Sequence, residues 1–180
     1  MNLPNKLTVG RIVCTIVMCV FLLLPGAVSA WICPIIFSLA ALTDWFDGHI
    51  ARSRGLVTNL GKFMDPLADK ILNYSVMILL IPENLIPAVT LVIILFREFV
   101  VAGIRQAGAE QNIVIAANIW GKIKTFFQDI SLVLILLLRA MDAPFLTPLS
   151  QILMWICAAL TVISGVIYVV QNAEVLREKP

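Results

Sequence analysis

Charged residues are scarce in this chain of 180 residues, and this scarcity limits what the protein can be. Only 13% of the residues are charged and 61% are hydrophobic, whereas soluble domains carry roughly 25% charged residues. The 13 basic and 11 acidic side chains cannot cover the surface of a soluble globule of this length. The composition therefore argues against a soluble enzyme, a nucleic-acid-binding protein and a disordered chain, and it favours an all-α membrane protein.

Cysteine and histidine are also few, and their positions exclude two kinds of site. His49 is the single histidine, and no Cys-x-x-Cys pair occurs. The four cysteines all lie in apolar stretches: Cys14, Cys19, Cys33 and Cys157. We expect them to be small buried hydrophobic side chains, with no disulfide framework and no zinc site.

Long apolar runs dominate the rest of the chain. Six of them cover residues 8–30, 34–52, 63–81, 86–108, 113–139 and 148–170. The first run imitates a secretory signal, but further apolar sequence follows it, so we expect it to remain as a span. At about 20 residues per span, the pattern predicts a single domain over residues 1–180, a polytopic membrane protein with six transmembrane helices and a short N-terminal interfacial helix. The connections are short, so consecutive helices should run antiparallel as near neighbours.

Lysine and arginine are distributed unevenly along this topology. One side of the membrane receives the N-terminus, the connections at 53–62 and 105–112, and the C-terminus, and 11 of the 13 basic residues flank it. The other side has Arg139 alone, while Arg97 lies in mid-span. Because cytoplasmic loops carry the excess of basic residues, both termini should be cytoplasmic.

The acidic residues are concentrated at one place. Four of the 11 fall within 26 positions: Asp44, Asp47, Asp65 and Asp69. Asp44 and Asp47 are three residues apart near the end of the second run, and Asp65 and Asp69 are four apart in the third, so each pair shares a helix face. The 53–62 connection should fold the two helix ends together on the cytoplasmic side.

Four carboxylates so close together need compensation, because each costs several kcal/mol to desolvate. Two protons could supply it, or two divalent cations held by hard oxygen ligands, which favour Mg²⁺, Mn²⁺ or Ca²⁺. Pairs of such ions serve phosphoryl transfer. Helix caps and solvated helix ends are the structural alternative. Small residues accompany the acids (Gly48, Ala51 and Gly61), and Arg52 lies one turn after Gly48, within reach of a phosphate.

These residues form a pattern that resembles the signature of the CDP-alcohol phosphotransferase family. The pattern D-x2-D-G-x2-A-R-x8-G-x3-D-x3-D is complete between Asp44 and Asp69, with eight fixed residues. The six-helix layout extends the resemblance over essentially the whole chain. It implies direct attack of an alcohol on the lipid-bearing phosphorus of CDP-diacylglycerol in a bacterial cell membrane, with CMP as the leaving group.

The resemblance also implies a role for each residue of the pattern. The four aspartates would hold two divalent cations, Mg²⁺ or Mn²⁺, and Asp69 would also accept the proton of the attacking alcohol. The residues implied to bind CDP-diacylglycerol are Asn5, Thr8, Gly48, Ala51, Arg52 and Gly61, with Arg11 close to the first two. Members of the family are homodimers, so the resemblance implies a dimer.

Flanking segments are similar to the family members whose acceptor is sn-glycerol 3-phosphate. These segments are residues 4–11, Asp65–Lys70, Arg97-Glu98-Phe99 and 121–125. A phosphomonoester carries a charge of about −2 and needs cations of its own. The candidate acceptor-binding residues lie near the cytoplasmic ends of the fourth and fifth helices: Arg105, Lys122, Lys124 and Thr125. For the basic ones, the alternative is membrane-surface snorkelling.

Two further expectations concern ionisable residues inside the spans. Arg97 and Glu98 are adjacent and point about 100° apart, so we do not expect them to pair, whereas Glu98 and Arg105 share a face and are candidates for a pair. A polar stripe on the fifth helix should line the acceptor cavity: Asn118, Lys122, Thr125 and Asp129.

Other functions remain open at this point. Another acceptor, such as serine, inositol phosphate or phosphatidylglycerol, would suit the same carboxylates, although a neutral or zwitterionic acceptor would not need the basic group. A small cation-coupled transporter would place its acids along a path and not at one face. A structural membrane subunit would leave the four aspartates unexplained.

Overall fold

The computed structural model describes residues 3–53, 59–111, 113, 115–116 and 118–176, and the side chains of these residues outside 3–7, 44–53, 59–63, 174 and 176. The described chain contains six α-helices and no strand, which confirms the all-α class. The elements are α1 (Leu3–Leu23), α2 (Ala27–Ser53), α3 (Asn59–Leu80), α4 (Ala88–Glu110), α5 (Ile119–Ala140), α6 (Leu146–Gln171) and a short 3-10 turn, η1 (Ala173–Leu176).

The start of the chain differs from expectation. No separate interfacial helix precedes the first span in the described residues, because α1 runs without a break from Leu3 to Leu23. Pro4 is tolerated there because it stands in the first turn, where the missing N–H has no helical acceptor. The helix ends at Leu23, well before residue 30, and Pro25 and Gly26 then turn the chain. Gly26 has a φ of +124°, a backbone conformation that side chains other than glycine's rarely adopt.

The fifth helix begins later than the apolar pattern predicts. The apolar run starts at Ile113, but α5 starts at Ile119, after Asn118 caps it by accepting a hydrogen bond from the backbone N–H of Trp120 at 3.1 Å. Ile113 and Ile115 instead fold back on the end of α4. The N–H of Ile113 donates to the carbonyl of Gly108 at 2.8 Å, and a Cβ on Gly108 would lie 2.8 Å from Ile115 Cδ1.

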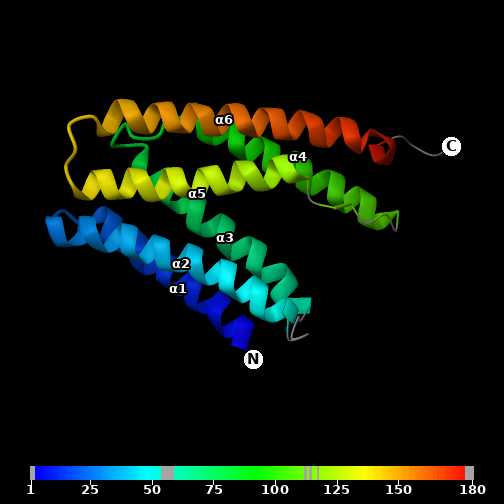
Figure 1. The fold of residues 1–180 in the computed structure, drawn as a ribbon, viewed down its shortest axis with the longest axis horizontal. Helices are drawn as coiled ribbons and strands as arrows, with labels where there is room; N and C mark the ends of the chain where they lie inside the picture. The colour runs from blue at the N-terminus through cyan, green and yellow to red at the C-terminus, as the bar shows by residue number, and fades with distance from the viewer. Residues whose placement is uncertain (1–2, 54–58, 112, 114, 117, 177–180) are drawn as a thin grey trace.

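The helices form two groups of three, α1–α3 and α4–α6, that meet mainly where α2 packs on α5 (Figure 1). The groups lie together at the end that holds the α1–α2 and α5–α6 connections, and they diverge towards the end that holds both chain termini. One buried apolar core joins the groups, with members from all six helices, among them Met18, Phe37, Leu72, Ile94, Leu132 and Met154. Consecutive helices run antiparallel, as expected, but the expectation that each pair would be near neighbours was wrong. The pairs α1–α2 and α5–α6 pack closely, whereas α2–α3 and α3–α4 touch only slightly, because α3 packs mainly on α1 and α4 on α6.

We call the end where the two helix groups lie together the closed end and the end where they diverge the open end. Polar contacts stabilise the closed end. Arg139 at the end of α5 donates to both carboxylate oxygens of Glu83, at 2.7 and 2.8 Å. Gln151 of α6 donates to the carbonyl of Asn84 at 3.0 Å. These contacts hold the α3–α4 connection against α5 and α6, far from the open end.

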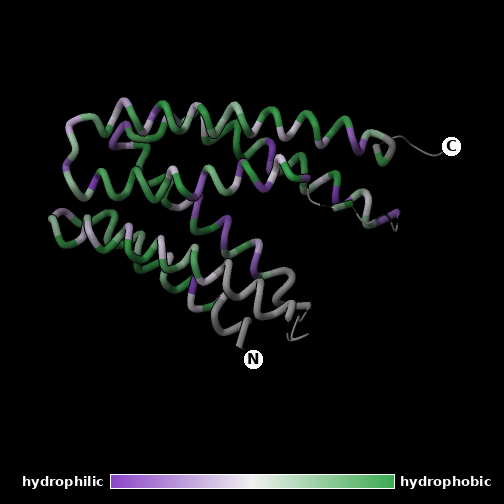
Figure 2. Tube along the Cα trace, viewed as in Figure 1, coloured by the Kyte–Doolittle hydropathy of each residue, from purple (hydrophilic) through white to green (hydrophobic). Residues whose placement is uncertain are grey.

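The distribution of polarity is that of a protein surrounded by lipid. Large apolar side chains are exposed along most helices, among them Val28, Phe96, Phe99 and Val170. Figure 2 shows that hydrophobic residues predominate along the described helices. Polar side chains such as Lys124, Gln128, Ser131 and Thr161 are buried inside. Within the described residues, α6 alone meets the length and hydropathy of a membrane span, and Thr8–Leu23 and Ala27–Thr43 are shorter apolar stretches.

The cysteines agree in part with expectation. All four are free thiols, and Cys33 and Cys157 are buried. Cys14, however, is exposed, and Cys19 is half-buried. The outer face of α1 is itself apolar, with Val13, Ile16 and Val17 exposed, so an exposed Cys14 lies among apolar neighbours.

Candidate functional site

The described half of the predicted carboxylate cluster lies on α3. Asp65 and Asp69 are one turn apart and both half-buried. The hydroxyl of Thr8, from the start of α1, donates a hydrogen bond to Asp65 Oδ1. Thr8 itself is buried, as is Arg11 one turn later. The structure therefore brings the N-terminal segment to the first aspartate of α3, as the predicted CDP-diacylglycerol site requires.

The other residues of the pattern lie outside the described side chains. Asp44, Asp47, Gly48, Ala51 and Arg52 belong to the last turns of α2, and Gly61 to the first turn of α3, as Asn5 does to that of α1. No group of three or more metal-ligating side chains occurs within the described part of the chain. The two described carboxylates fit a hard divalent cation in chemistry, since both are oxygen donors on one helix face. The four-aspartate cluster itself stays a prediction.

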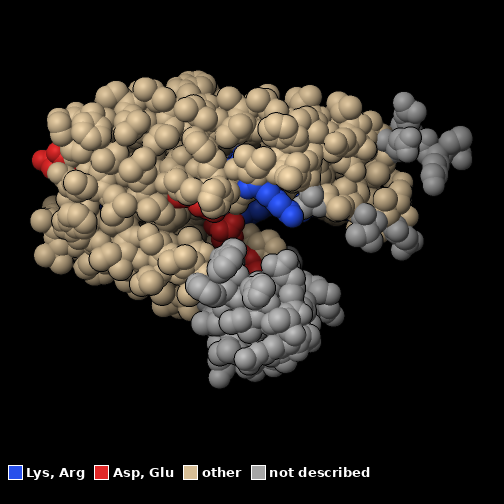
Figure 3. Space-filling model, viewed as in Figure 1, with Lys and Arg blue, Asp and Glu red and all other residues tan. Residues whose placement is uncertain are grey.

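A polar cavity of about 730 Å³ opens beside these carboxylates, where the two helix groups diverge. α3, α4, α5 and α6 all contribute to its walls, with Lys70, Arg97, Glu98, Arg105, Lys122 and Asp129 among its lining residues. Figure 3 shows acidic and basic side chains gathered in this hollow. All four members of the predicted polar stripe line it, which confirms their inward orientation, although Asn118 precedes the helix as its cap.

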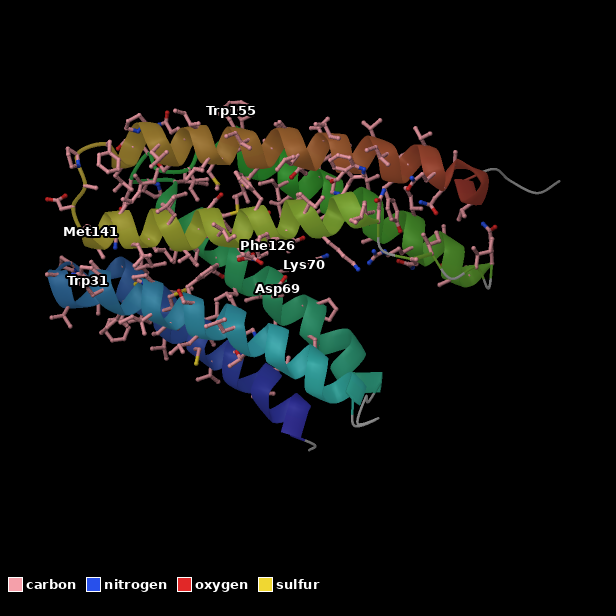
Figure 4. All side chains as sticks on the ribbon, viewed as in Figure 1. Trp31, Asp69, Lys70, Phe126, Met141 and Trp155 are labelled. Atoms are coloured by element: carbon pink, nitrogen blue, oxygen red, sulfur yellow. The ribbon has the colours of Figure 1, made fainter. Side chains whose placement is uncertain are left out.

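A smaller cavity of about 60 Å³ lies next to the large one and reaches Asp69. The two cavities share Lys70, Glu98 and Thr125 as walls. Figure 4 places Asp69, Lys70 and Phe126 in the space between α3 and α5. The carboxylate of Asp69 and the basic residues of the large cavity thus line two neighbouring cavities with common walls.

Glu98 stands at the centre of an ion-pair network in this region. Its carboxylate lies 3.1 Å from each of three cationic groups: Lys70 Nζ, Arg97 Nη1 and Lys124 Nζ. The expectation that Arg97 and Glu98 do not pair was wrong, because two long side chains on neighbouring positions can both turn into the same gap between helices. Both members of this mid-span pair thus belong to one network of charges.

The predicted acceptor-binding residues divide between the two cavities. Arg105, Lys122 and Thr125 line the large one. Lys124 lies behind them in the small one, only 2% exposed and paired with Glu98. Lys122 and Lys124 are two positions apart and therefore point about 200° apart on α5, which explains why one faces the open cavity and the other the bundle interior.

The sequence matches the CDP-alcohol phosphatidyltransferase family over residues 1–163. The chain belongs to this family. Three similar proteins carry the name CDP-diacylglycerol–glycerol-3-phosphate 3-phosphatidyltransferase. The one from Bacillus subtilis (strain 168) is 38% identical over 98% of this chain and 97% of its own length. Those from Rickettsia bellii and Haemophilus influenzae are 36% and 33% identical, over 93% and 73% of this chain and the same shares of their own.

Two residues of this CDP-alcohol phosphatidyltransferase site were missed by sequence reasoning. Tyr168 of α6 is 1% exposed, and its hydroxyl accepts a hydrogen bond from Arg105 Nε at 3.1 Å while the guanidinium lies 5.7 Å from the ring centre. Their spacing makes Glu98 and Arg105 candidates for a pair, but this expectation was wrong. Arg105 pairs with Tyr168 instead. Asn73 of α3 donates to Asp129 Oδ1 of α5 at 2.9 Å. Both contacts join residues more than 50 positions apart, which no local pattern reveals.

Proposed function

We propose that this protein transfers the phosphatidyl group of CDP-diacylglycerol to sn-glycerol 3-phosphate, which yields phosphatidylglycerophosphate and CMP. The observation that carries the proposal is that Asp69 lines a small cavity which shares walls with the large one lined by Arg105 and Lys122. An anionic acceptor that enters such a cavity would present its hydroxyl beside a carboxylate. The names of the similar proteins support the same reaction.

The chemical step needs one base and one electrophile. The acceptor hydroxyl gives its proton to the carboxylate of Asp69 as its oxygen attacks the phosphorus that bears the lipid. The new oxygen–phosphorus bond forms as the bond to the CMP oxygen breaks, and CMP leaves with the electron pair. The implied ligands of two divalent cations, Mg²⁺ or Mn²⁺, are Asp44, Asp47, Asp65 and Asp69. When bound, such ions would stabilise the negative charge that develops on the diphosphate.

The acceptor phosphate would lie among Arg105, Lys122, Thr125 and Lys124. Arg105 is held from behind by Tyr168, which leaves its remaining donors for a ligand. Lys122 is exposed to the cavity and can meet a phosphate that arrives from water. These cations favour a dianionic acceptor over serine or another uncharged or zwitterionic one, because an unpaired cationic wall is costly without an anion.

CDP-diacylglycerol would occupy the side of the carboxylates that faces α1 and α2. The contact between Thr8 and Asp65 supports this, since it brings the N-terminal segment to the reacting region. Small residues at Gly48, Ala51 and Gly61 would leave room for the nucleotide diphosphate, and Asn5 and Arg52 would bind it. The lipid tails would extend into the surrounding bilayer.

We further propose six transmembrane spans in a bacterial cell membrane, with both termini and the site cytoplasmic. The apolar outer face of the helices supports this arrangement. The two termini lie at the same, open end of the molecule, as an even number of spans requires (Figure 1). The homodimer is proposed on the resemblance to the family alone.

One assay tests the reaction. The purified protein in detergent, with CDP-diacylglycerol and Mg²⁺ or Mn²⁺, is offered sn-glycerol 3-phosphate, serine and inositol phosphate in parallel, and CMP release is measured. We expect release with glycerol 3-phosphate alone, and none after chelation of the divalent ions. Release with serine instead would contradict the acceptor, and no release with any acceptor would return the transporter to consideration.

A further inference from the structure

We infer that Glu98 is a positioning residue of the acceptor site: it is the internal counter-anion that holds Lys70, Arg97 and Lys124 together as a preassembled cationic wall for the acceptor's phosphate. The inference rests on the proposed function, because it assigns a role in binding that acceptor. Glu98 itself need not touch the substrate.

The contacts of Glu98 join three helices at one point. Oε1 accepts hydrogen bonds from Arg97 Nη1 of α4 and Lys124 Nζ of α5, and Oε2 lies 3.1 Å from Lys70 Nζ of α3. No cation of the trio lies on the same helix as another. One carboxylate thus fixes the relative positions of three positive groups that would otherwise repel one another.

The charges in this cluster do not balance. Three cations and one carboxylate leave a net charge of +2 among these four side chains. Those of Lys124, Arg97 and Glu98 are only 3%, 11% and 15% exposed, while that of Lys70 is 41% exposed. Asp69 and Asp129 line the neighbouring cavity walls, outside this group of four. A largely buried excess of positive charge within the group is costly unless an anion enters. A phosphomonoester, with a charge of about −2, supplies the missing amount. The cluster borders the large cavity, so an anion can reach it from there.

Arg97 is fixed by shape as well as by charge. A Cβ on Gly121 of α5 would lie 3.1 Å from Arg97 Nη2, and a Cβ on Gly165 of α6 would lie 2.9 Å from Arg97 Cγ. The two glycines therefore form a slot for this side chain. Within the described residues, Arg97 Nε is buried without a hydrogen-bond partner, so the guanidinium keeps donor capacity for an anion in the cavity.

A matched control exists at the opposite end of the molecule. Glu83 and Arg139 form an ion pair of better geometry, at 2.7 and 2.8 Å, and neither lines a cavity of the site. Replacing Glu83 by glutamine removes a carboxylate from a guanidinium, as replacing Glu98 does, although Glu83 is the more exposed of the two, at 38% against 15%. A general loss of ion pairing would affect both variants alike.

The experiment compares Glu98→Gln, Glu98→Asp and Glu83→Gln in steady-state CMP release, with each substrate varied in turn. We expect Glu98→Gln to raise the KM for sn-glycerol 3-phosphate at least tenfold and to leave the KM for CDP-diacylglycerol within twofold. Glu98→Asp should recover most of the acceptor affinity, since it keeps the charge. Glu83→Gln should leave both KM values unchanged.

A second measurement does not depend on turnover. In detergent, glycerol 3-phosphate should raise the Tm of the wild-type protein and of Glu83→Gln, and this shift should be lost in Glu98→Gln. Should Glu98→Gln fail to fold, the double variant Glu98→Gln/Lys124→Met keeps the net charge of the cluster at +2 and is compared with Lys124→Met alone. We expect a higher acceptor KM in the double variant, and equal values in the two would overturn the inference.

An unchanged acceptor KM in Glu98→Gln, an equal rise in both KM values, or the same rise in Glu83→Gln would overturn the inference. Failure of the proposed function is a different result, because the wild-type protein would then release no CMP with glycerol 3-phosphate and would show no shift in Tm with it.

Discussion

Single residues around Asp69 define what this site can do. Asp69 has a hydroxyl-accepting carboxylate at the edge of a polar cavity, while Asp65 one turn earlier is engaged by Thr8. The two aspartates of α3 are chemically alike but have different surroundings. Asp65 accepts a hydrogen bond from Thr8 of the N-terminal segment, and Asp69 lines the smaller cavity, next to the one in which we propose that the acceptor binds.

The Asp69→Asn variant should lose turnover by about 100-fold or more, because a positioned general base contributes roughly 10²–10⁴ to the rate. Asparagine keeps the shape but accepts no proton. Some binding of CDP-diacylglycerol should remain, measured by the protection it gives against thermal unfolding. Asp142→Asn is the matched control, since Asp142 is exposed at the closed end with a φ of 50°, which asparagine tolerates. Wild-type rates in Asp69→Asn would rule out the base.

Arg105→Ala should raise the KM for sn-glycerol 3-phosphate by about tenfold or more, as expected for a lost hydrogen-bonded charge, and should change the KM for the lipid less. Tyr168→Phe removes the acceptor of the Arg105 hydrogen bond but keeps the ring beneath the guanidinium. Because a hydrogen bond contributes about 0.5–1.5 kcal/mol net, we expect the KM of Tyr168→Phe for sn-glycerol 3-phosphate to be roughly two- to tenfold higher than that of the wild type. Equal acceptor KM values in Arg105→Ala and the wild type would contradict the phosphate assignment.

Helices bring these residues together through close approaches that need glycine. α4 and α6 pack with Arg97 against Gly165, and α5 adds Gly121 on the other side. Gly103, on the same α4 and close to Arg97 in sequence, has open space around the position of a Cβ. Glycine therefore has a packing function at two places and none at the third.

Gly165→Ala should lower the free energy of unfolding by about 1–3 kcal/mol, because the added methyl overlaps the stem of Arg97 in a packed interface. Gly103→Ala should instead raise it by about 0.5–1 kcal/mol, since alanine favours the helix and meets nothing. Thermal or denaturant unfolding in detergent measures both. If the two variants change stability in the same direction, the slot around Arg97 is not a tight one.

The whole molecule combines a closed end with an open one. Ion pairing between Glu83 and Arg139 and the shared apolar core hold the two helix groups together at one end, and the groups diverge at the other (Figure 1). The polar cavity occupies the divergence, where we propose that a water-soluble acceptor and a lipid meet. This shape suits a reaction between a membrane substrate and a cytoplasmic one.

Reporter fusions test the proposed orientation. A fluorescent protein that matures only in the cytoplasm should fluoresce when it is fused after Pro180, and a phosphatase that is active only outside the cytoplasm should be active when it is inserted at Asp142. The basic residues at the open end are the reason for this expectation. Activity of the phosphatase at the C-terminus would reverse the topology.

Local pattern was enough for the number of helices, the direction of their connections and the inward face of α5. Apolar run length and turn residues carry that information, and Lys122, Thr125 and Asp129 could be placed in a cavity from their spacing alone. Local pattern failed where two signals competed. The apolar residues from Ile113 onwards predict a helix, yet this segment is a connection that packs on Gly108. The helix α5 begins after Asn118 instead, because the Asn118 side chain caps it by accepting a hydrogen bond from the N–H of Trp120.

The sequence by itself determined the family and the pattern from Asp44 to Asp69, and its composition favoured a membrane protein, because composition and fixed spacing are properties of the chain alone. Only the tertiary structure decided which charges meet. Glu98 forms ion pairs with Lys70 and Lys124 of other helices, and Arg105 donates a hydrogen bond to Tyr168. These partners are 26 to 63 residues apart. Their contacts depend on the angles at which helices pack, which are set by side chains throughout the core and not by the residues that pair.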